Sequence, residues 1–267
     1  MLETEDRHRD EHPVAPTRRS SGRWLLAAAA AVAVVTMVGA LVVVGGDEEQ
    51  LGTVTAPPTT VSGDSLPVGP HVMVSTVGLN EDRVAVTIPP SGWVAAPDEG
   101  SLIKDLGGDD RVTVVTVAGD HYGVPEDICR WQAGELVPSN DASTAHGLLS
   151  LLREQTYDTP EGSRARVLSA PVDISINGDS GRSVTGPLPD IDPSGCDEQR
   201  FCSLLDRDGA RCLLPHVEPN ALVTLWSVDV PNRNPSPWVV AATYQPTTSP
   251  ELLAEMNAIV DSMTVAP

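Results

Sequence analysis

The sequence predicts an α+β fold, in which one N-terminal transmembrane helix precedes an exported antiparallel β-sheet domain with packed helices. Three observations lead to this fold class. Residues 24–44 form one long apolar run, segments with period-two apolar spacing recur from residue 71 onwards, and apolar side chains recur at helical spacing over residues 250–263. Because strands joined by turns outnumber the helices, the pattern indicates helices set against one side of an antiparallel sheet.

The apolar run predicts the transmembrane helix. From Trp24 to Val44 it contains 21 residues and no charged side chain, so at ~1.5 Å per residue it reaches about 30 Å, the thickness of the hydrocarbon core of a bilayer. The alternative is a cleaved secretory signal, which the small residues around Gly39 would suit. Since the run exceeds the ~7–15 apolar residues of a signal peptide, we predict a membrane anchor over residues 24–45.

The charges that flank this helix predict its orientation. Five arginines precede it, and no Lys or Arg follows it until Arg83. Positive residues are retained on the cytoplasmic side, so we expect the N-terminus in the cytoplasm and the C-terminal domain beyond the cell membrane. A lipid anchor is excluded because the first cysteine, Cys129, lies far from the span.

The remaining boundaries follow from composition. Residues 1–23 are polar without apolar periodicity and predict a disordered cytoplasmic tail. Residues 46–70 are rich in Pro and Thr and predict an extended linker, so residues 71–267 form the exported α+β domain. A signal-transmitting role would normally require a folded cytoplasmic domain, which this tail lacks.

The net charge of −20 argues against partners that carry negatively charged phosphate groups. In the tail, five arginines balance five acidic residues, so the excess acid lies in the exported part. Without a basic face to neutralise phosphates, neither nucleic acid nor anionic lipid head groups are expected partners. The acidic exterior is interpreted as a solvated surface. Lys104 is the single lysine against sixteen arginines, a bias that indicates a GC-rich bacterial genome.

All four cysteines, Cys129, Cys196, Cys202 and Cys212, fall in the exported part. An even number in an oxidising compartment predicts two disulfides, for which three pairings are possible. Because three of the four lie within residues 196–212, one bond is expected to close inside that segment. A zinc site is the rival interpretation, but the sequence contains no C-x-x-C pair.

Alternating β-branched residues and turn signals predict the strands and helices of the exported domain. Strands are expected at residues 72–74, 84–88, 111–118, 167–176, 182–185, 201–205, 211–217, 221–230 and 238–245. Helices are expected at Pro125–Glu135, at Asp141–Tyr157 with Asp141 or Ser143 as the cap, and after the capping Ser249 with Pro250 in the first turn.

Three segments of these elements resemble a known family. They are V-A-V-T-I-P-P-S-G-W at 84–93, W-V-V-A-A-T-Y at 238–244 and I-V-D-S-M-T-V at 259–265. They resemble the PsbP-like superfamily, to which the LpqN-like exported proteins of bacterial envelopes belong, over about residues 71–267. The resemblance implies a curved antiparallel sheet with helices on its faces and a role in binding or assembly. It implies no catalytic residue, and the cysteine-rich insert at 190–215 has no counterpart in it.

Ser180 lies in a G-D-S-G motif, which looks like the nucleophile loop of trypsin-like serine proteases. That family also needs a histidine and a buried aspartate. His146 is only 34 residues upstream and falls in a predicted helix, and Arg182 stands where the family has a glycine. We therefore interpret Asn177-Gly178-Asp179 as a turn between strands.

The other histidines are scattered, at His71, His121 and His216, and no metal-ligand spacing, calcium loop or phosphate-binding glycine loop occurs. We therefore predict no cofactor and no metal. Trp226 and Trp238 fall on strands and are expected in the core, whereas Trp93 follows a turn and is expected to edge a possible groove.

The predicted function is a membrane-anchored extracytoplasmic binding or assembly module of a bacterial cell envelope, without catalysis. Its expected ligand is an envelope protein, a glycan or a lipid, bound on the open face of the sheet or on its rim. The alternative is an envelope hydrolase that uses Ser180 with His121 or His216.

Overall fold

The computed structural model describes residues 65–75, 82–89, 92–96, 100–117, 122–132, 134–137, 142–206, 209–231 and 237–265. The predicted tail (1–23), transmembrane helix (24–45) and most of the linker (46–70) lie outside these ranges. Within these ranges no helix is long and apolar enough to cross a membrane. The described part of the domain starts at Ser65, which forms a bridge with Val94, and the first strand starts at Gly69.

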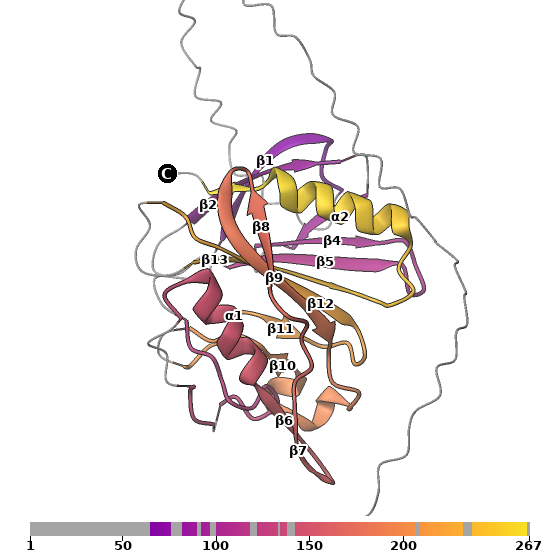
Figure 1. Ribbon diagram of the computed structural model, residues 1–267. Coiled ribbons are helices and arrows are strands. Elements are labelled where there is room, and N and C mark those ends of the chain that lie inside the picture. Colours follow the sequence, from indigo (N-terminus) through magenta and orange to yellow (C-terminus); the bar gives the residue numbers. More distant parts are fainter. Residues whose placement is uncertain are drawn as a thin grey trace, which may run out of the picture. The chain divides into compact units, whose positions relative to one another are not determined.

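A seven-stranded antiparallel sheet organises the domain (Figure 1). Its strand order is β3-β4-β5-β13-β12-β9-β8. The strands span Val94–Ala96 (β3), Ser101–Asp105 (β4), Arg111–Val117 (β5), Trp238–Tyr244 (β13), Leu222–Val228 (β12), Asp179–Pro187 (β9) and Val172–Ile176 (β8). The α+β class is therefore confirmed for the part of the chain that the structure describes.

Smaller elements complete the domain. A three-stranded sheet joins β1 (Gly69–Ser75), β2 (Asp82–Ile88) and β14 (Thr264–Val265). Two hairpins are formed by β6 (Thr156–Thr159) with β7 (Gly162–Ala165), and by β10 (Phe201–Cys202) with β11 (Pro215–His216). Short 3-10 helices lie at η1 (Pro193–Gly195) and η2 (Asp197–Gln199).

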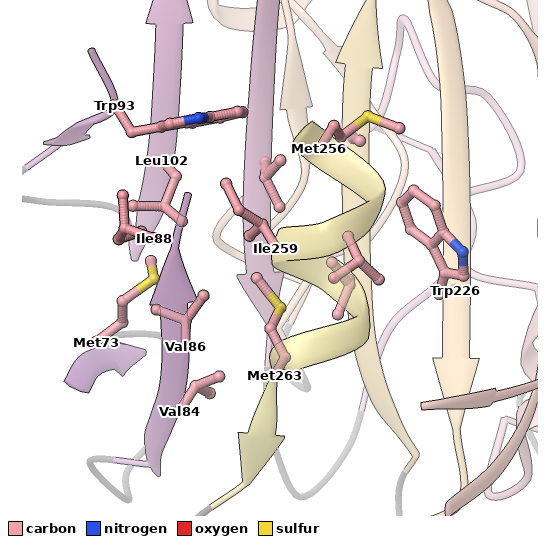
Figure 2. Packing of buried hydrophobic residues seen from close by; sticks show 14 of the residues in the cluster. Met73, Val84, Val86, Ile88, Trp93, Leu102, Trp226, Met256, Ile259 and Met263 are labelled. Atoms are coloured by element: carbon pink, nitrogen blue, oxygen red, sulfur yellow. The ribbon is translucent and has the colours of Figure 1, made fainter. Parts of the chain in front are cut away.

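The two α-helices of the described residues cover opposite faces of the main sheet. Helix α2 (Pro250–Ser262) shares a core with Val228, Val240 and Ala242, and Figure 2 shows its Met256 and Ile259 in this core. Helix α1 (Ala145–Glu154) shares a second core with Val223, Leu225, Val239 and Ala241. Because alternate residues of one strand face opposite sides of a sheet, the prediction that the helices lie on one side is wrong.

The segment predicted as a helix at Pro125–Glu135 is instead made of bends, turns and isolated bridges over residues 125–132 and 134–135. Its backbone bonds to distant strands: Ile128 N donates to Thr156 O, and Cys202 N donates to Ile128 O. The Asp127 side chain accepts from Cys129 N at 2.6 Å, a local bond that competes with a helix.

Helix α1 is shorter than predicted. Its cap is Thr144, whose side chain accepts from Gly147 N at 3.0 Å, instead of Asp141, which lies outside the described residues, or Ser143. Helix α2 has the predicted start, with Ser249 at the cap position and Pro250 in the first turn. Trp226 and Trp238 are buried, as predicted.

Candidate functional site

The two disulfides join Cys129 to Cys196 and Cys202 to Cys212. The predicted bond inside residues 196–212 is therefore confirmed. We call residues 122–132, 134–137, 191–206 and 209–216 the disulfide lobe. The lobe contacts the main sheet on the side of α1, because its Leu204, Leu213 and Leu214 belong to the core that α1 shares with β12 and β13.

Trp93 does not edge a groove. Its side chain is fully buried in the core beneath α2, where Figure 2 shows it across from Met256. The indole Nε1 donates to Glu255 Oε2 at 3.0 Å. Burial of the large apolar indole ring stabilises the fold more than the preceding turn favours an exposed position. The expectation that Trp93 edges a groove is therefore wrong.

Ser180 lies on β9, directly after the turn that Asn177 and Gly178 form with φ of 49° and 91°. The prediction of a strand-to-strand turn is confirmed, since β8 and β9 pair across it. The Ser180 side chain is exposed, and its cross-strand partner is Ser175. No described histidine hydrogen-bonds to Ser180.

The histidines take separate positions. His146 is exposed on α1, and its Nδ1 lies 2.6 Å from Arg182 Nη1. His216 is buried and makes its side-chain hydrogen bonds to other residues than Ser180, while His121 lies outside the described residues. The hydrolase alternative therefore has no serine–histidine contact at Ser180 in the part of the chain that the structure describes.

A buried polar cluster lies where the disulfide lobe contacts the main sheet. His216 on β11 places Nε2 3.0 Å from Ser203 Oγ and Nδ1 3.1 Å from Thr243 Oγ1 on β13. Gln155, at the end of α1, donates from Nε2 to Ser203 O at 3.0 Å and to Pro125 O at 3.1 Å. These bonds connect the end of α1, the lobe and the sheet, and Gln155, Ser203 and His216 are shielded from water.

Arg166 supplies the positive charge of this cluster. It follows β7, is 4% exposed, and its Nη1 donates to Gln155 Oε1 at 2.6 Å. Its Nε and Nη2 have no hydrogen-bond partner, and no carboxylate of the described residues forms an ion pair with it. Leaving a buried polar group without a hydrogen bond costs about 1–3 kcal/mol.

The cluster changes the acidity of both ionisable members. Burial lowers the pKa of Arg166 to about 10, so the guanidinium stays protonated at neutral pH. Burial, with a smaller contribution from the charge of Arg166, lowers the pKa of His216 to about 3. His216 is therefore neutral at pH 7, and the cluster carries a single positive charge.

Sequence reasoning missed Arg166 and Ser203, and named His216 only as a partner for Ser180. One signal was present: Arg166 and His216 are each followed by a valine, and Val167 and Val217 are exposed while the polar residues are buried. In these two pairs the polar residue lies inside and the apolar residue outside, which is the reverse of the usual alternation. Such a reversal is a feature of functional sites. The sequence does not show it, because only the folded structure shows which of two neighbours is buried.

The outer edge of β8 is the second feature of interest. Among the described strands, β8 pairs with β9 alone and ends the main sheet. The preceding residues continue this edge, since Ser169 N donates to Thr185 O at 2.8 Å. Val167 and Val172 on the edge are 68% and 60% exposed.

Metal ligation finds no support within the described ranges, where no group of three or more His, Cys, Asp or Glu side chains is placed to hold an ion. The cysteines are all used in disulfides, which removes the ligands of the rival zinc interpretation.

Comparisons with known proteins give a distant structural likeness. No family model matches the sequence, and no curated protein matches it. Among solved structures, the fold is similar to the crystal structure of LpqN, involved in cell envelope biogenesis of Mycobacterium tuberculosis, with 12% identity and a TM-score of 0.33. The match covers 74% of this chain and 92% of LpqN. The resemblance read from the sequence is thus confirmed only as a weak structural likeness, which transfers neither a site nor an activity.

Proposed function

We propose that this chain is a membrane-tethered extracytoplasmic module that binds a protein of a bacterial envelope and carries out no reaction itself. The tether is the apolar run at residues 24–44, and the arginines that precede it support a cytoplasmic N-terminus. The two disulfides support an oxidising compartment for the folded domain.

The free edge of β8 is the observation that carries the binding role. In the described part of the chain, α2 packs against one face of the main sheet and α1 against the other, which favours the rim over a sheet face as the place where a partner binds. At the opposite edge, residues 65–66 already pair beside β3, since Leu66 N donates to Trp93 O at 2.6 Å. The rim at β8 is the part of the sheet that remains for a partner.

The chemistry of this edge suits an extended polypeptide. An unpaired strand edge presents backbone N–H and C=O groups that a further strand can bind, and exposed side chains beside it provide specificity. The edge strand starts at Val172. Pro171 before it has no backbone N–H to donate, so a partner strand would pair with residues 172–176. The partner is therefore a protein segment that adds a strand to β8.

The test uses photo-crosslinking in native membranes. A photoreactive residue replaces Val172 in the full-length chain, and the matched control replaces Val72 on β1, which is 61% exposed. We expect one reproducible protein adduct from position 172 and none from position 72, and Val172→Asp should abolish capture of the same protein. Adducts of equal yield at both positions, or adducts with glycan or lipid alone, would overturn the proposal.

The hydrolase alternative is tested in the same membranes with a fluorophosphonate probe. We expect equal, background labelling of the wild-type chain and Ser180→Ala, because no described histidine contacts Ser180. Labelling that the substitution removes would establish a reactive serine and end the non-catalytic interpretation.

A further inference from the structure

The two sides of β8 differ in chemistry along its outer edge. Ile176 belongs to the core that the sheet shares with α2, and Ile174 packs against that core. Val172 points to the same side, because alternate residues of a strand share a face, and it is 60% exposed. Asp173 and Ser175 are exposed and point to the side of α1. An added strand therefore meets an apolar row on one side and a polar row on the other.

The backbone groups of Asp173 and Ser175 point outwards from the sheet. Ser180 O accepts from Asp229 N at 3.0 Å, so Ser180 directs its backbone groups away from its cross-strand partner Ser175. Hydrogen-bonded and non-hydrogen-bonded pairs alternate along an antiparallel ladder. Asp173 therefore has the orientation of Ser175, whereas Ile174 between them bonds to β9. An added strand would bond to the N–H and C=O groups of residues 173 and 175.

The local charge of this edge is negative. The side chain of Asp173 is 83% exposed, and its Oδ1 lies 2.9 Å from Arg182 Nε on β9. Neighbouring strands are ~4.8 Å apart, so an added strand lies closer to Asp173 than to Arg182. Residues 167–181 contain Asp173 and Asp179 but no Lys or Arg. A cation opposite Asp173 would continue the alternation of charge that Arg182 and Asp173 begin.

The charge of the whole exported part favours the same kind of partner. The N-terminal tail is balanced, so the net charge of −20 belongs to the exported part. Two copies of such a domain repel each other, whereas a basic segment is attracted and its encounter is accelerated. The second copy of this chain is therefore a poorer occupant of the edge than a basic polypeptide.

We propose that the strand added to β8 alternates apolar and basic residues, with its apolar side chains beside Val172 and Ile174 and a Lys or Arg opposite Asp173. This inference rests on the proposed function and specifies the partner that binds there. Opposite charges directly across a pair of strands stabilise the pairing, and like charges destabilise it. A segment with an acidic residue at this position is therefore rejected.

The experiment measures fluorescence anisotropy of labelled seven-residue peptides with the full-length chain in a non-ionic detergent at pH 7. One peptide alternates valine and lysine, the second alternates valine and glutamate, and the third has the composition of the first with its lysines in one block. We expect saturable binding of the first peptide and about ten-fold weaker binding of the others. The block peptide controls for unspecific attraction to an acidic domain, and binding equal to that of the first peptide would contradict the proposal.

Two aspartates provide matched variants. Asp173→Asn removes the carboxylate opposite the predicted cation, and we expect about a three-fold loss of affinity for the alternating lysine peptide. Asp158→Asn removes the same charge from an exposed position on β6, outside the main sheet, and should leave the affinity unchanged. Equal affinities of the two variants would show that Asp173 does not select the partner.

Amide hydrogen exchange separates this inference from strand addition itself. The alternating lysine peptide should slow exchange at Asp173 and Ser175 but not at Ile174, whose N–H already bonds to β9. Equal protection by the glutamate peptide would leave strand addition standing and refute the basic partner. The same holds if the photo-adduct of position 172 is a second copy of this chain, or if an excess of the lysine peptide does not prevent its formation. Absence of protection with the lysine peptide contradicts the inference directly.

Discussion

Lys104 Nζ lies 2.6 Å from Glu255 Oε2, and this ion pair joins β4 to α2. The same carboxylate oxygen accepts from Trp93 Nε1 at 3.0 Å. One glutamate on the helix thus satisfies the only lysine of the chain and a buried indole. The pair fixes the position of α2 over the sheet in a way that apolar contacts, which have no direction, do not.

Replacement of this glutamate should be costly. Glu255→Gln leaves the buried Lys104 ammonium without a negative partner, and we expect a loss of about 3 kcal/mol in the free energy of unfolding. Urea denaturation measures it. Glu251→Gln, an exposed change on the same helix, is the control and should stay within about 0.5 kcal/mol. Equal losses of stability in the two variants would show that the Lys104–Glu255 ion pair contributes no more than an exposed glutamate does.

The two disulfides should contribute unequally to stability. Cys129 and Cys196 are 67 residues apart, whereas Cys202 and Cys212 are 10 apart. In the chain-entropy description, the longer loop stabilises the fold by about 1.7 kcal/mol more. Paired Cys→Ala variants, compared by urea denaturation, should therefore lose more stability at the Cys129–Cys196 bond. The reverse order would contradict an origin in loop closure.

Acidification should destabilise the domain through His216. Its pKa falls from an ordinary 6.5 to about 3 on folding, so below pH 6.5 the unfolded chain takes up a proton that the folded chain does not. Stability is then lost as the pH drops from 6.5 towards 3, by about 1.4 kcal/mol per pH unit. The free energy of unfolding is measured against pH for the wild-type chain and for His216→Gln. The wild-type value should fall at this rate relative to the value of the variant. A difference that is independent of pH would contradict the buried, neutral histidine.

Gly186 on β9 should not tolerate a side chain. A Cβ atom there would lie 2.0 Å from the backbone oxygen of Val167 and 3.0 Å from Leu168 Cα. Gly186→Ala should therefore cost about 3 kcal/mol, because the backbone of residues 167–168 or of β9 must move. Gly195→Ala, with no atom within 4 Å of the new Cβ, is the control and should change little. Equal thermal midpoints for the two variants would mean that segment 167–169 is not held against β9.

Local patterns account for the elements that the sequence predicted well. Alternating β-branched residues predicted β5, β12 and β13 close to their observed bounds, and Ser249-Pro250 predicted the start of α2. The Asn177-Gly178 turn was predicted because few residues adopt positive φ at low cost. In each case neighbours in the chain are sufficient to select the conformation.

Distant contacts account for the elements that the sequence did not predict. Residues 125–132 and 134–135 have a helix-like composition, but the backbone of Glu126 and Ile128 bonds to β6 and β10, more than twenty residues away. Trp93 follows a turn, yet the area of its ring is buried beneath α2. The polarity of Arg166 predicts exposure, yet the residue is 4% exposed and its guanidinium contacts Gln155 at the end of α1.

The sequence by itself determined the α+β class, most of the strands, the terminal helix and the requirement that one disulfide close within residues 196–212, because each depends on local spacing or on counting. Only the tertiary structure decided the strand order, the placement of the helices on opposite faces, the pairing of the cysteines and the enclosure of Arg166 beside His216. These features depend on which distant parts of the chain pack together. The free energy of such contacts arises between segments far apart in the sequence, so local patterns do not predict them.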